Sequence, residues 1–542
     1  MRKFCFSIMC LVLNAGLFAQ VDAIVPFTSS NLPIVVIKSS LSIKDDPKVT
    51  ASMGIIDNWP ARNNLTDPYN VYDGLIGIEI RGSSSQMFPK KQYGLELRDE
   101  SGNGIAASLL SMPEEEDWIL FAPYNDKSLM RDALAYRMGR SLGQYAPRTK
   151  FCELVINDMY LGVYVLMEKI KRDKNRVDIN KLEPTEISGN DLSGGYILKI
   201  DKMTDGGEAW NSEYQPPNAK GQTIEFQYEY PEADEIVPEQ RSYIQKYVSQ
   251  FEGALAGDNF ADPLTGYAKY IDVNSFVDYF IMQEVTKNVD GYRLSTFFYK
   301  QRESDGGKLV MGPIWDFNHA FGNANYCTNG NPEGFVHNFN NICPDDYWLI
   351  PFWWKRLLQH SSFRTKVATR WAELRAGVFT ENAIHNYIDS VALVLNLESQ
   401  ARNFKAWNVL NKYVWPNYYV GPTFQSEVNW LKGWVSQRLV WLDQNMPSLI
   451  TATEQKGESL DDTQAYPNPF SSDVTIGYSI QKSGEVDISI WDSTGRNINS
   501  VKINHDTSGE YSYSWRCDIS GIYYYSVKQG TTSIGDGRLF KR

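Results

Sequence analysis

The chain has 542 residues, of which 65 are acidic and 53 basic, so its formal net charge is −12. An acidic chain without a basic block is poorly suited to bind nucleic acid or an anionic membrane. Charged residues make up 22% of the chain and aromatic residues 13%, a composition that argues against disorder and allows a large core.

Residues 1–20 have the pattern of a secretory signal peptide. Arg2 and Lys3 form a charged start, an apolar run covers residues 4–18, and Ala19 provides a small residue for cleavage. The run is too short and wrongly flanked for a membrane span, and no other stretch approaches about 18 uninterrupted apolar residues. We therefore expect an exported chain whose mature form has no transmembrane segment.

Residues 21–450 are expected to form an α+β domain with two lobes. Residues 35–200 are rich in strand patterns and contain one amphipathic helix at 129–142. Amphipathic helices follow at 381–395 and 425–442. About 430 residues exceed the usual size of a single core, so a β-rich lobe followed by a helical lobe is expected.

A small-residue turn and two adjacent lysines stand in the β-rich part. The turn contains Arg81, Ser83 and Ser84, and Lys90 and Lys91 open the strand that follows. Side chains alternate between the two faces of a strand, so only one of the lysines can share a face with the apolar residues of this strand. That residue is Lys91, with Lys90 as the competitor.

Two aspartates farther along, Asp290 and Asp316, flank a strand-like segment at 294–300. A phosphoryl-transfer enzyme needs a lysine for the phosphates, an acid that orients or deprotonates the acceptor, and another acid that holds a metal. The order of a basic strand and two acids therefore suggests a nucleotide site. A chain with 65 acidic residues contains many aspartate pairs, and a glycosidase pair is the alternative chemistry.

The cysteines fit an oxidising compartment. Cys327 and Cys343 bracket an insertion rich in Gly, Asn and Pro, and we expect a disulfide between them. Cys152 stands in an apolar strand, where a buried free thiol is expected. The chain has neither a CxxC pair nor a His/Cys cluster, so a structural zinc site is not expected.

The character of the chain changes after residue 450. Residues 451–465 are polar and lack apolar periodicity, as in a linker. Residues 466–542 then show alternating strand patterns at 474–478, 486–490 and 521–527, which predict a small all-β sandwich.

Several segments of residues 35–445 together resemble the CotH (spore coat protein H) family of secreted, atypical protein kinases. Each segment is short, but six of them occur in the order found in the family. They are residues 81–91, 125–131, 157–168, 194–196, 288–293 and 312–318.

This resemblance implies an atypical protein-kinase-like domain of two lobes, with ATP between the lobes and Mg²⁺ or Mn²⁺ on its phosphates. Lys91 would contact phosphate and Glu168 would pair with that lysine. Asp290 would be the catalytic acid and Asp316 a metal ligand. The other nucleotide-binding residues implied are Arg81, Ser83, Ser84, Lys90 and Arg131.

Three residues also have ordinary structural interpretations. Glu168 begins a mixed-charge run, which usually marks a solvated face. Arg131 opens an amphipathic helix, where it could cap or bridge. Asp201 follows a predicted strand and is interpreted as a turn residue outside the site.

The chain departs from the usual kinase pattern at three points. No GxGxxG loop precedes the lysines, so the turn at Arg81 would have to hold the phosphates with its amides and hydroxyls. Ser295 stands where a kinase places a metal-binding Asn, and Asn318 replaces the glycine of the Asp-Phe-Gly turn. Ser295 and Asn318 are the further candidate metal ligands. Slow or absent catalysis with retained nucleotide binding is therefore one expectation.

Residues 466–542 resemble the type A sorting domain of the type IX secretion system. The matching parts are residues 468–470, the turn at 492–496 and the strand at 520–523. The resemblance implies export by the type IX secretion machinery and a final location in the medium or on the outer-membrane surface. A carbohydrate-binding or adhesive β-module is the alternative.

Three functions remain open. The first is a secreted or surface-attached protein kinase that transfers phosphate from ATP to Ser or Thr of surface or exported proteins. The second is a catalytically inactive surface scaffold that binds nucleotide or a partner. The third, a glycan-active surface protein, would leave the segments around Lys91 and Glu168 unexplained.

Overall fold

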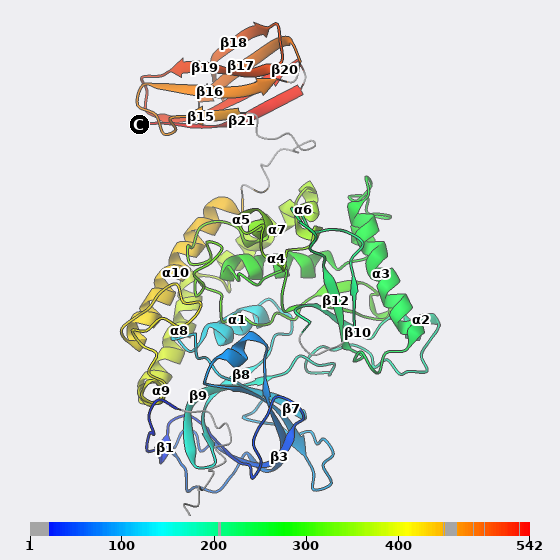
Figure 1. Cartoon of the computed structure of the whole chain (residues 1–542), viewed down its shortest axis with the longest axis vertical. Helices are drawn as coiled ribbons and strands as arrows, with labels where there is room; N and C mark the ends of the chain where they lie inside the picture. The colour runs from blue at the N-terminus through cyan, green and yellow to red at the C-terminus, as the bar shows by residue number, and fades with distance from the viewer. Residues whose placement is uncertain are drawn as a thin grey trace, which may run out of the picture. The chain divides into compact units, whose positions relative to one another are not determined.

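The computed structural model describes residues 21–203, 208–447, 449, 463–480, 482–492, 494–530 and 532–542. The predicted signal peptide, 1–20, lies outside these ranges, as do residues 451–462 of the predicted linker; residues 463–465 belong to a strand. The chain divides into two units, Met1–Ala452 and Thr453–Arg542 (Figure 1). Helices and strands are mixed in the first unit, which confirms the α+β class.

Seven strands of the first unit close into a barrel in the order β2-β3-β5-β6-β7-β9-β8. Neighbouring strands are antiparallel except β2 and β8, which close the barrel in parallel. Alternation along β6 places Tyr93, Leu95 and Leu97 in the barrel core. The strands are β2 (Ile34–Lys38), β3 (Val49–Ile56), β5 (Tyr72–Arg81), β6 (Gln92–Arg98), β7 (Asp117–Phe121), β8 (Thr149–Ile156) and β9 (Met159–Glu168).

A second sheet of five antiparallel strands has the order β11-β12-β10-β13-β14. Its members are β10 (Tyr196–Ile200), β11 (Ala209–Asn211), β12 (Glu225–Tyr230), β13 (Thr296–Lys300) and β14 (Leu309–Met311). Assigning residues 35–200 to one β-rich lobe was wrong at its end, because β10 pairs with β12 and β13 rather than with the barrel. The last two short strands, β1 (Ser29–Ser30) and β4 (Asn63–Asn64), pair with each other.

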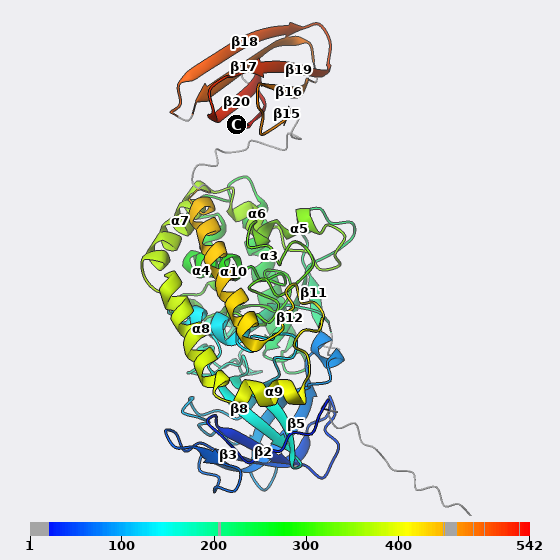
Figure 2. The same ribbon diagram turned by 90° about the vertical axis from the view of Figure 1, so that its left-hand side faces the viewer.

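Helices make up much of the rest of the first unit. α1 contacts α4 and α8, and in Figure 1 it lies between the barrel and α4. Figure 2 shows α7, α8 and α10 along one side, with α9 next to the barrel, where it contacts β9. The helices are α1 (Arg131–Arg140), α2 (Gly189–Leu192), α3 (Pro238–Ala256), α4 (Val273–Thr286), α5 (Phe339–Ile342), α6 (Trp353–Leu357), α7 (Ser361–Ala376), α8 (Glu381–Asn396), α9 (Ser399–Ala406) and α10 (Phe424–Asn445).

The three helices predicted from periodicity are present as α1, α8 and α10. In α8, Ile384, Ile388, Val391 and Leu395 are buried at spacings of three and four, the pattern of a helix with one apolar face. The hydroxyl of Thr380 accepts from Ala383 N at 3.2 Å and starts this helix. Among the helices of the described ranges, none is both long enough and apolar enough to cross a membrane.

Cys327 and Cys343 form a disulfide with their Cα atoms 5.8 Å apart, as predicted. Cys152 is a buried free thiol on β8, also as predicted. The disulfide closes residues 327–343 within the segment between β14 and α6, and the part of this segment before Cys327 carries residues of the candidate site described below.

The second unit consists of two sheets in its described part. Their orders are β15-β16-β19 and β18-β17-β20-β21. Inward side chains of both sheets, among them Ile476, Ile488 and Val527, share one apolar core, as in the predicted sandwich. The strands are β15 (Thr463–Tyr466), β16 (Asp473–Ile480), β17 (Gly484–Asp492), β18 (Asn497–His505), β19 (Gly509–Arg516), β20 (Gly521–Gln529) and β21 (Thr532–Lys541).

Candidate active site

The Asp290 loop, residues 287–295, begins where α4 ends. Lys287 ends the helix in a left-handed conformation with φ 46°, and Tyr292 and Ser295 also have positive φ, of 69° and 47°. Such values are uncommon outside glycine and persist where the surroundings fix the backbone. Tyr292 is fixed in this way, because its hydroxyl donates to Glu284 Oε1 at 3.1 Å.

Both carboxylate oxygens of Asp290 have partners. Arg293 Nη2 donates to Oδ1 at 2.8 Å, and His319 Nδ1 lies 3.2 Å from Oδ2. Burial favours the neutral acid, but the hydrogen bond from His319 and the charges of Arg293 and His319 outweigh it and lower the pKa of Asp290 to about 2. Asp290 is therefore ionised at neutral pH and fixed in orientation, as a residue that orients an acceptor hydroxyl must be.

The two partners of Asp290, His319 and Arg293, have further hydrogen-bond partners of their own. Asn125 Nδ2 lies 3.0 Å from His319 Nε2, so the imidazole is held between Asn125 on one side and Asp290 on the other. Arg293 Nη1 donates to Asp346 and to the carbonyl oxygen of Trp348, each at 3.1 Å. Residues far apart in the sequence thus fix one carboxylate.

The Asp316 loop, residues 312–321, follows β14 and contacts the Asp290 loop. Asn288 Nδ2 donates to the carbonyl oxygen of Asp316 at 3.4 Å, and Phe321 N donates to Thr286 O at 2.7 Å. Asp316 has a φ of 60° and Phe321 of 51°. The structure therefore brings Asp290 and Asp316 together on two adjoining loops with left-handed backbone positions.

Asp316 is a buried carboxyl that has both acidic and cationic neighbours. Burial raises the pKa of Asp316, Asp290 and Asp201 add to the rise, and His319 and Arg81 only partly offset it. Asp201 directly follows β10 and accepts from Ser295 Oγ at 3.3 Å. Burial raises the pKa of the Asp201 carboxyl as well.

This set of donors fits a hard divalent cation. Carboxylate, amide and hydroxyl oxygens suit Mg²⁺ and Mn²⁺, and a bound cation would favour the ionised form of Asp316, whose pKa is raised by burial. The residues that could hold it are Asp316 and Asp201, with Ser295 and Asn318 as neutral donors. Asn318 is fixed by Asn323, whose Nδ2 donates to the Asn318 carbonyl oxygen at 2.8 Å.

Sequence reasoning missed Asp201, Arg293 and Asn125. Asp201 was interpreted as a turn residue, yet it interacts with Ser295 and Asp316. In the sequence, Asp201 was marked only by its position directly after a predicted strand. Arg293 and Asn125 lie inside two of the segments that carry the family resemblance, so a residue-by-residue inspection of those segments could have found both.

Arg81 reaches the site from the end of β5. Its charge acts on Asp316, its Nη1 donates to Gln92 Oε1 at 3.4 Å, and its guanidinium lies 5.8 Å from the ring centre of Trp315. Ser83 and Ser84 follow in an exposed turn that leads into the short 3-10 helix η1 (Ser84–Met87). The hydroxyls of this turn are open to solvent beside Arg81.

The two lysines have different partners. Lys91 is half-buried, and its Nζ donates to Gln86 O at 2.6 Å, so it fastens the turn that carries Ser83 and Ser84. Lys90 is buried, and its Nζ donates to Val163 O at 2.6 Å and to Asn403 Oδ1 at 2.8 Å. Burial lowers the pKa of Lys90 to about 7. Lys90 thereby links the barrel to α9.

Two predicted nucleotide-site residues are paired elsewhere. Glu168 is fully buried and accepts from Arg148 Nη1 at 2.7 Å and from Arg148 N at 2.8 Å, rather than from Lys91. Arg131 is 1% exposed, forms an ion pair with Asp126 and donates to Ser128 Oγ at 3.1 Å. The structure thus gathers Arg81, Ser295, Asn318, Asp290 and Asp316, while Lys90, Glu168 and Arg131 have structural partners.

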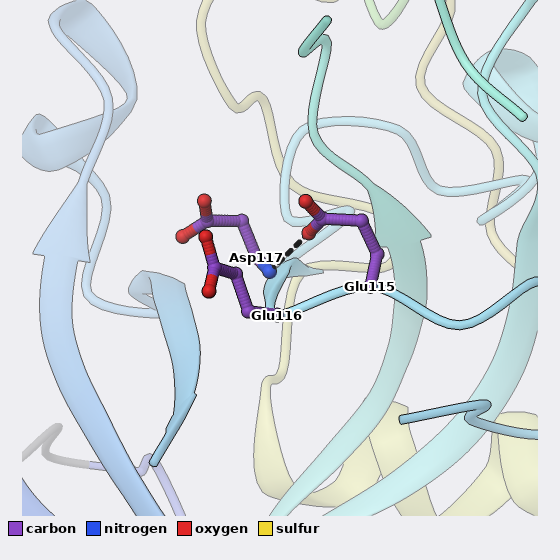
Figure 3. A group of neighbouring side chains, drawn as sticks. All are labelled: Glu115, Glu116 and Asp117. Carbon is purple, nitrogen blue, oxygen red and sulfur yellow. Dashed lines mark hydrogen bonds between the residues drawn. The ribbon is translucent and has the colours of Figure 1, made fainter. Parts of the chain in front are cut away.

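A separate group of carboxylates, Glu115, Glu116 and Asp117, lies at the start of β7 (Figure 3). These three are close enough together to share a cation. Lys171 already supplies one, because its Nζ lies 2.9 Å from Glu115, 2.6 Å from Glu116 and 2.8 Å from Asp117. Burial works against the charged lysine, but Asp117 and the two glutamates raise the pKa of Lys171. We interpret this cluster as a structural ion-pair network.

Comparison with known families identifies both units. Residues 78–442 match the family model described as CotH kinase protein, and residues 464–536 match the secretion system C-terminal sorting domain. A search of curated proteins gave no match. Because the first match covers more than half of the sequence, the chain belongs to the CotH kinase family, and it carries a type IX sorting domain at its C-terminal end.

Proposed function

We propose that the chain is an atypical protein kinase that acts outside the cell and transfers phosphate from ATP to Ser or Thr of surface or exported proteins. The observation that carries this proposal is the meeting of Asp290 and Asp316 on two adjoining loops, with Arg81 facing Asp316 from the barrel. The proposal includes the two-lobed kinase-like arrangement, with the barrel as one lobe and the second sheet with its helices as the other.

Asp290 would orient the acceptor hydroxyl and accept its proton, since it is ionised and held by Arg293 and His319. Asp316 would hold Mg²⁺ or Mn²⁺ together with Asp201, Ser295 and Asn318. The bound ion would supply neutralisation of charge on the phosphate oxygens.

Arg81 and the exposed hydroxyls of Ser83 and Ser84 would contact the phosphates, with Lys91 fastening their turn. Lys91 itself would reach phosphate only by exchanging its bond to Gln86. For Lys90, Glu168 and Arg131, a role in nucleotide binding requires each side chain to leave its present partner.

The sorting domain suggests export through the type IX secretion machinery, and the final location is outside the cell or on the outer-membrane surface. We propose that the signal peptide at 1–20 starts this route. The acceptors would then be other exported or surface proteins.

A nucleotide-binding scaffold without turnover is the second candidate. Two observations favour it: Ser295 occupies the position of a metal-binding Asn, and Asp290, with a pKa of about 2, is a weak base.

Labelled phosphate distinguishes the candidates. The full chain is incubated with γ-labelled ATP and Mg²⁺ or Mn²⁺, label in protein is followed, and binding of a non-hydrolysable ATP analogue is measured by calorimetry. Metal-dependent labelling supports the kinase, and binding without labelling supports the scaffold. Neither binding nor labelling would overturn the nucleotide site, and glycan cleavage without ATP would identify the third class.

A further inference from the structure

Helix α1 holds the Asp316 loop through two consecutive backbone amides. Asp316 N donates to the hydroxyl oxygen of Tyr136 at 3.2 Å, and Phe317 N donates to Asp132 Oδ1 at 2.8 Å. The Tyr136 hydroxyl in turn donates to the same oxygen of Asp132 at 3.3 Å. Asp132 and Tyr136 lie one helical turn apart on α1, and both are buried.

These bonds act where the backbone is unusual. A φ of 60° at Asp316 lies in the left-handed region, which is uncommon outside glycine although aspartate adopts it more readily than most residues, and the contacts with α1 help to hold it. The ring of Tyr136 adds contacts with the neighbours of Asp316, at 6.0 Å from Trp315 and 6.3 Å from Phe317 between ring centres. Tyr136 therefore holds the backbone from which the Asp316 side chain extends.

Burying the Asp132 carboxyl costs free energy, and packing alone does not explain why a carboxyl stands at this position. Its second oxygen, Oδ2, is buried and has no hydrogen-bond partner among the residues that the structure describes. A buried polar atom without a partner usually destabilises a protein, and such an atom in a native structure calls for another reason to retain it. Here the other oxygen, Oδ1, accepts from Phe317 N and from the Tyr136 hydroxyl, and this anchoring gives a reason to retain Asp132.

We infer that Asp132 and Tyr136 are positioning residues that set the Asp316 carboxylate for metal and phosphate. The inference rests on the proposed function of Asp316 and adds two residues of α1 to it. Neither residue touches substrate. Loss of either anchor lets the loop leave its left-handed conformation, so metal affinity and turnover fall while the fold persists.

The test uses Tyr136→Phe in the full chain, because this variant keeps the ring and removes only the hydroxyl. We expect faster amide exchange in the peptide spanning residues 312–321 and a Mn²⁺ affinity about 10-fold lower by electron paramagnetic resonance in the presence of an ATP analogue. The turnover number kcat should fall about 10-fold or more, with a smaller change in KM for ATP. Asp132→Leu should behave in the same way.

Two matched variants separate positioning from general damage. Tyr196→Phe removes another buried hydroxyl, one that donates to Leu192 O at 2.8 Å, and should match wild type in every readout. Asp132→Asn keeps an acceptor for Phe317 N and should restore most of the Mn²⁺ affinity that Asp132→Leu loses.

The outcomes distinguish this inference from the proposed function. If wild type binds Mn²⁺ with ATP but Tyr136→Phe equals it in amide exchange and Mn²⁺ affinity, the inference is overturned and the function stands. If wild type shows no metal-dependent nucleotide binding, both fall.

Discussion

The molecule contains two groups of acidic side chains with opposite characters. Glu115, Glu116 and Asp117 are neighbours in sequence and surround the ammonium of Lys171. Asp290 and Asp316 come from separate loops, and burial together with Asp290 and Asp201 raises the pKa of Asp316 more than His319 and Arg81 lower it. The first group is an ion-pair network whose cation is Lys171, and the second is a set of buried carboxyls that an added cation could bind.

The backbone makes the same distinction. The Asp290 and Asp316 loops contain several non-glycine residues with positive φ, including Tyr292, Ser295 and Asp316, whereas Asp117 begins an ordinary strand. Strained positions that are held by many contacts are typical of functional sites. Closeness of acidic residues alone selects the cluster around Lys171, whereas backbone conformation selects the Asp290 and Asp316 loops.

The largest expected effect separates the two groups by activity. Asp290→Ala and Asp316→Ala should each lower phosphate transfer by about 100-fold or more, because one loses the group that orients the acceptor and the other a metal ligand. Glu116→Gln is the control in the other cluster and should stay within about twofold of wild type. The measurement is label incorporation from γ-labelled ATP. A loss with Glu116→Gln equal to that of the aspartate variants would remove the distinction.

The next largest effect is on stability and concerns the residues that hold the Asp290 loop in place. Glu284 binds Tyr292 of this loop and also accepts from Val336 N at 2.7 Å, in the segment closed by the disulfide. Replacing Cys327 and Cys343 by Ser should lower the free energy of unfolding of the first unit by about 3 kcal/mol, from loop entropy. Urea unfolding measures it, and Cys517→Ser serves as the control. Unchanged stability would mean that the segment is held without its disulfide.

A pH-dependent effect follows from the low pKa of Asp290. The folded-state pKa of about 2 lies below the usual value of an aspartate, so the charged form stabilises the fold at pH values above about 4 and this contribution is lost as the pH falls toward 2. Asp290→Asn should therefore cost about 2 kcal/mol at pH 7 and about half of that at pH 3.

Unfolding of wild type and Asp290→Asn in urea at both pH values provides the measurement. A difference between the two proteins that does not change with pH would show that the charge of Asp290 contributes no stability.

The smallest expected effect is in the structural cluster. Lys171→Met should destabilise the first unit by about 1 kcal/mol, since the lysine is partly exposed and such ion pairs contribute little. Phosphate transfer should remain at the wild-type rate. A tenfold change in transfer would show that Glu115, Glu116 and Asp117 take part in function after all.

Local patterns in the sequence were sufficient for several of these features. The periodicity of α8 and α10, the disulfide and the alternating strands of the second unit all depend on residues close together in the chain. Asp290 and Asp316 were selected from short motifs, and the structure brings them together.

Contacts between residues far apart in the chain could not be predicted from the sequence. Alternation favoured Lys91, but the face that it shares with Tyr93 and Leu95 lines the barrel core, which a sequence pattern cannot distinguish from a ligand site. Glu168 binds Arg148, and Asp201 lies near Asp316 because it follows β10, which belongs to the second sheet and not to the barrel. Each of these contacts depends on which strands pair across the fold.

A double-mutant cycle on the rate of phosphate transfer tests most directly whether Asp290 and Asp316 form one site. Asp290→Asn, Asp316→Asn and the double variant are compared with wild type in the full chain at saturating Mn²⁺. Groups that act together in one reaction are non-additive, so the double variant should be about as slow as the slower single variant. Losses that multiply would show that the two aspartates act independently and would contradict a shared site.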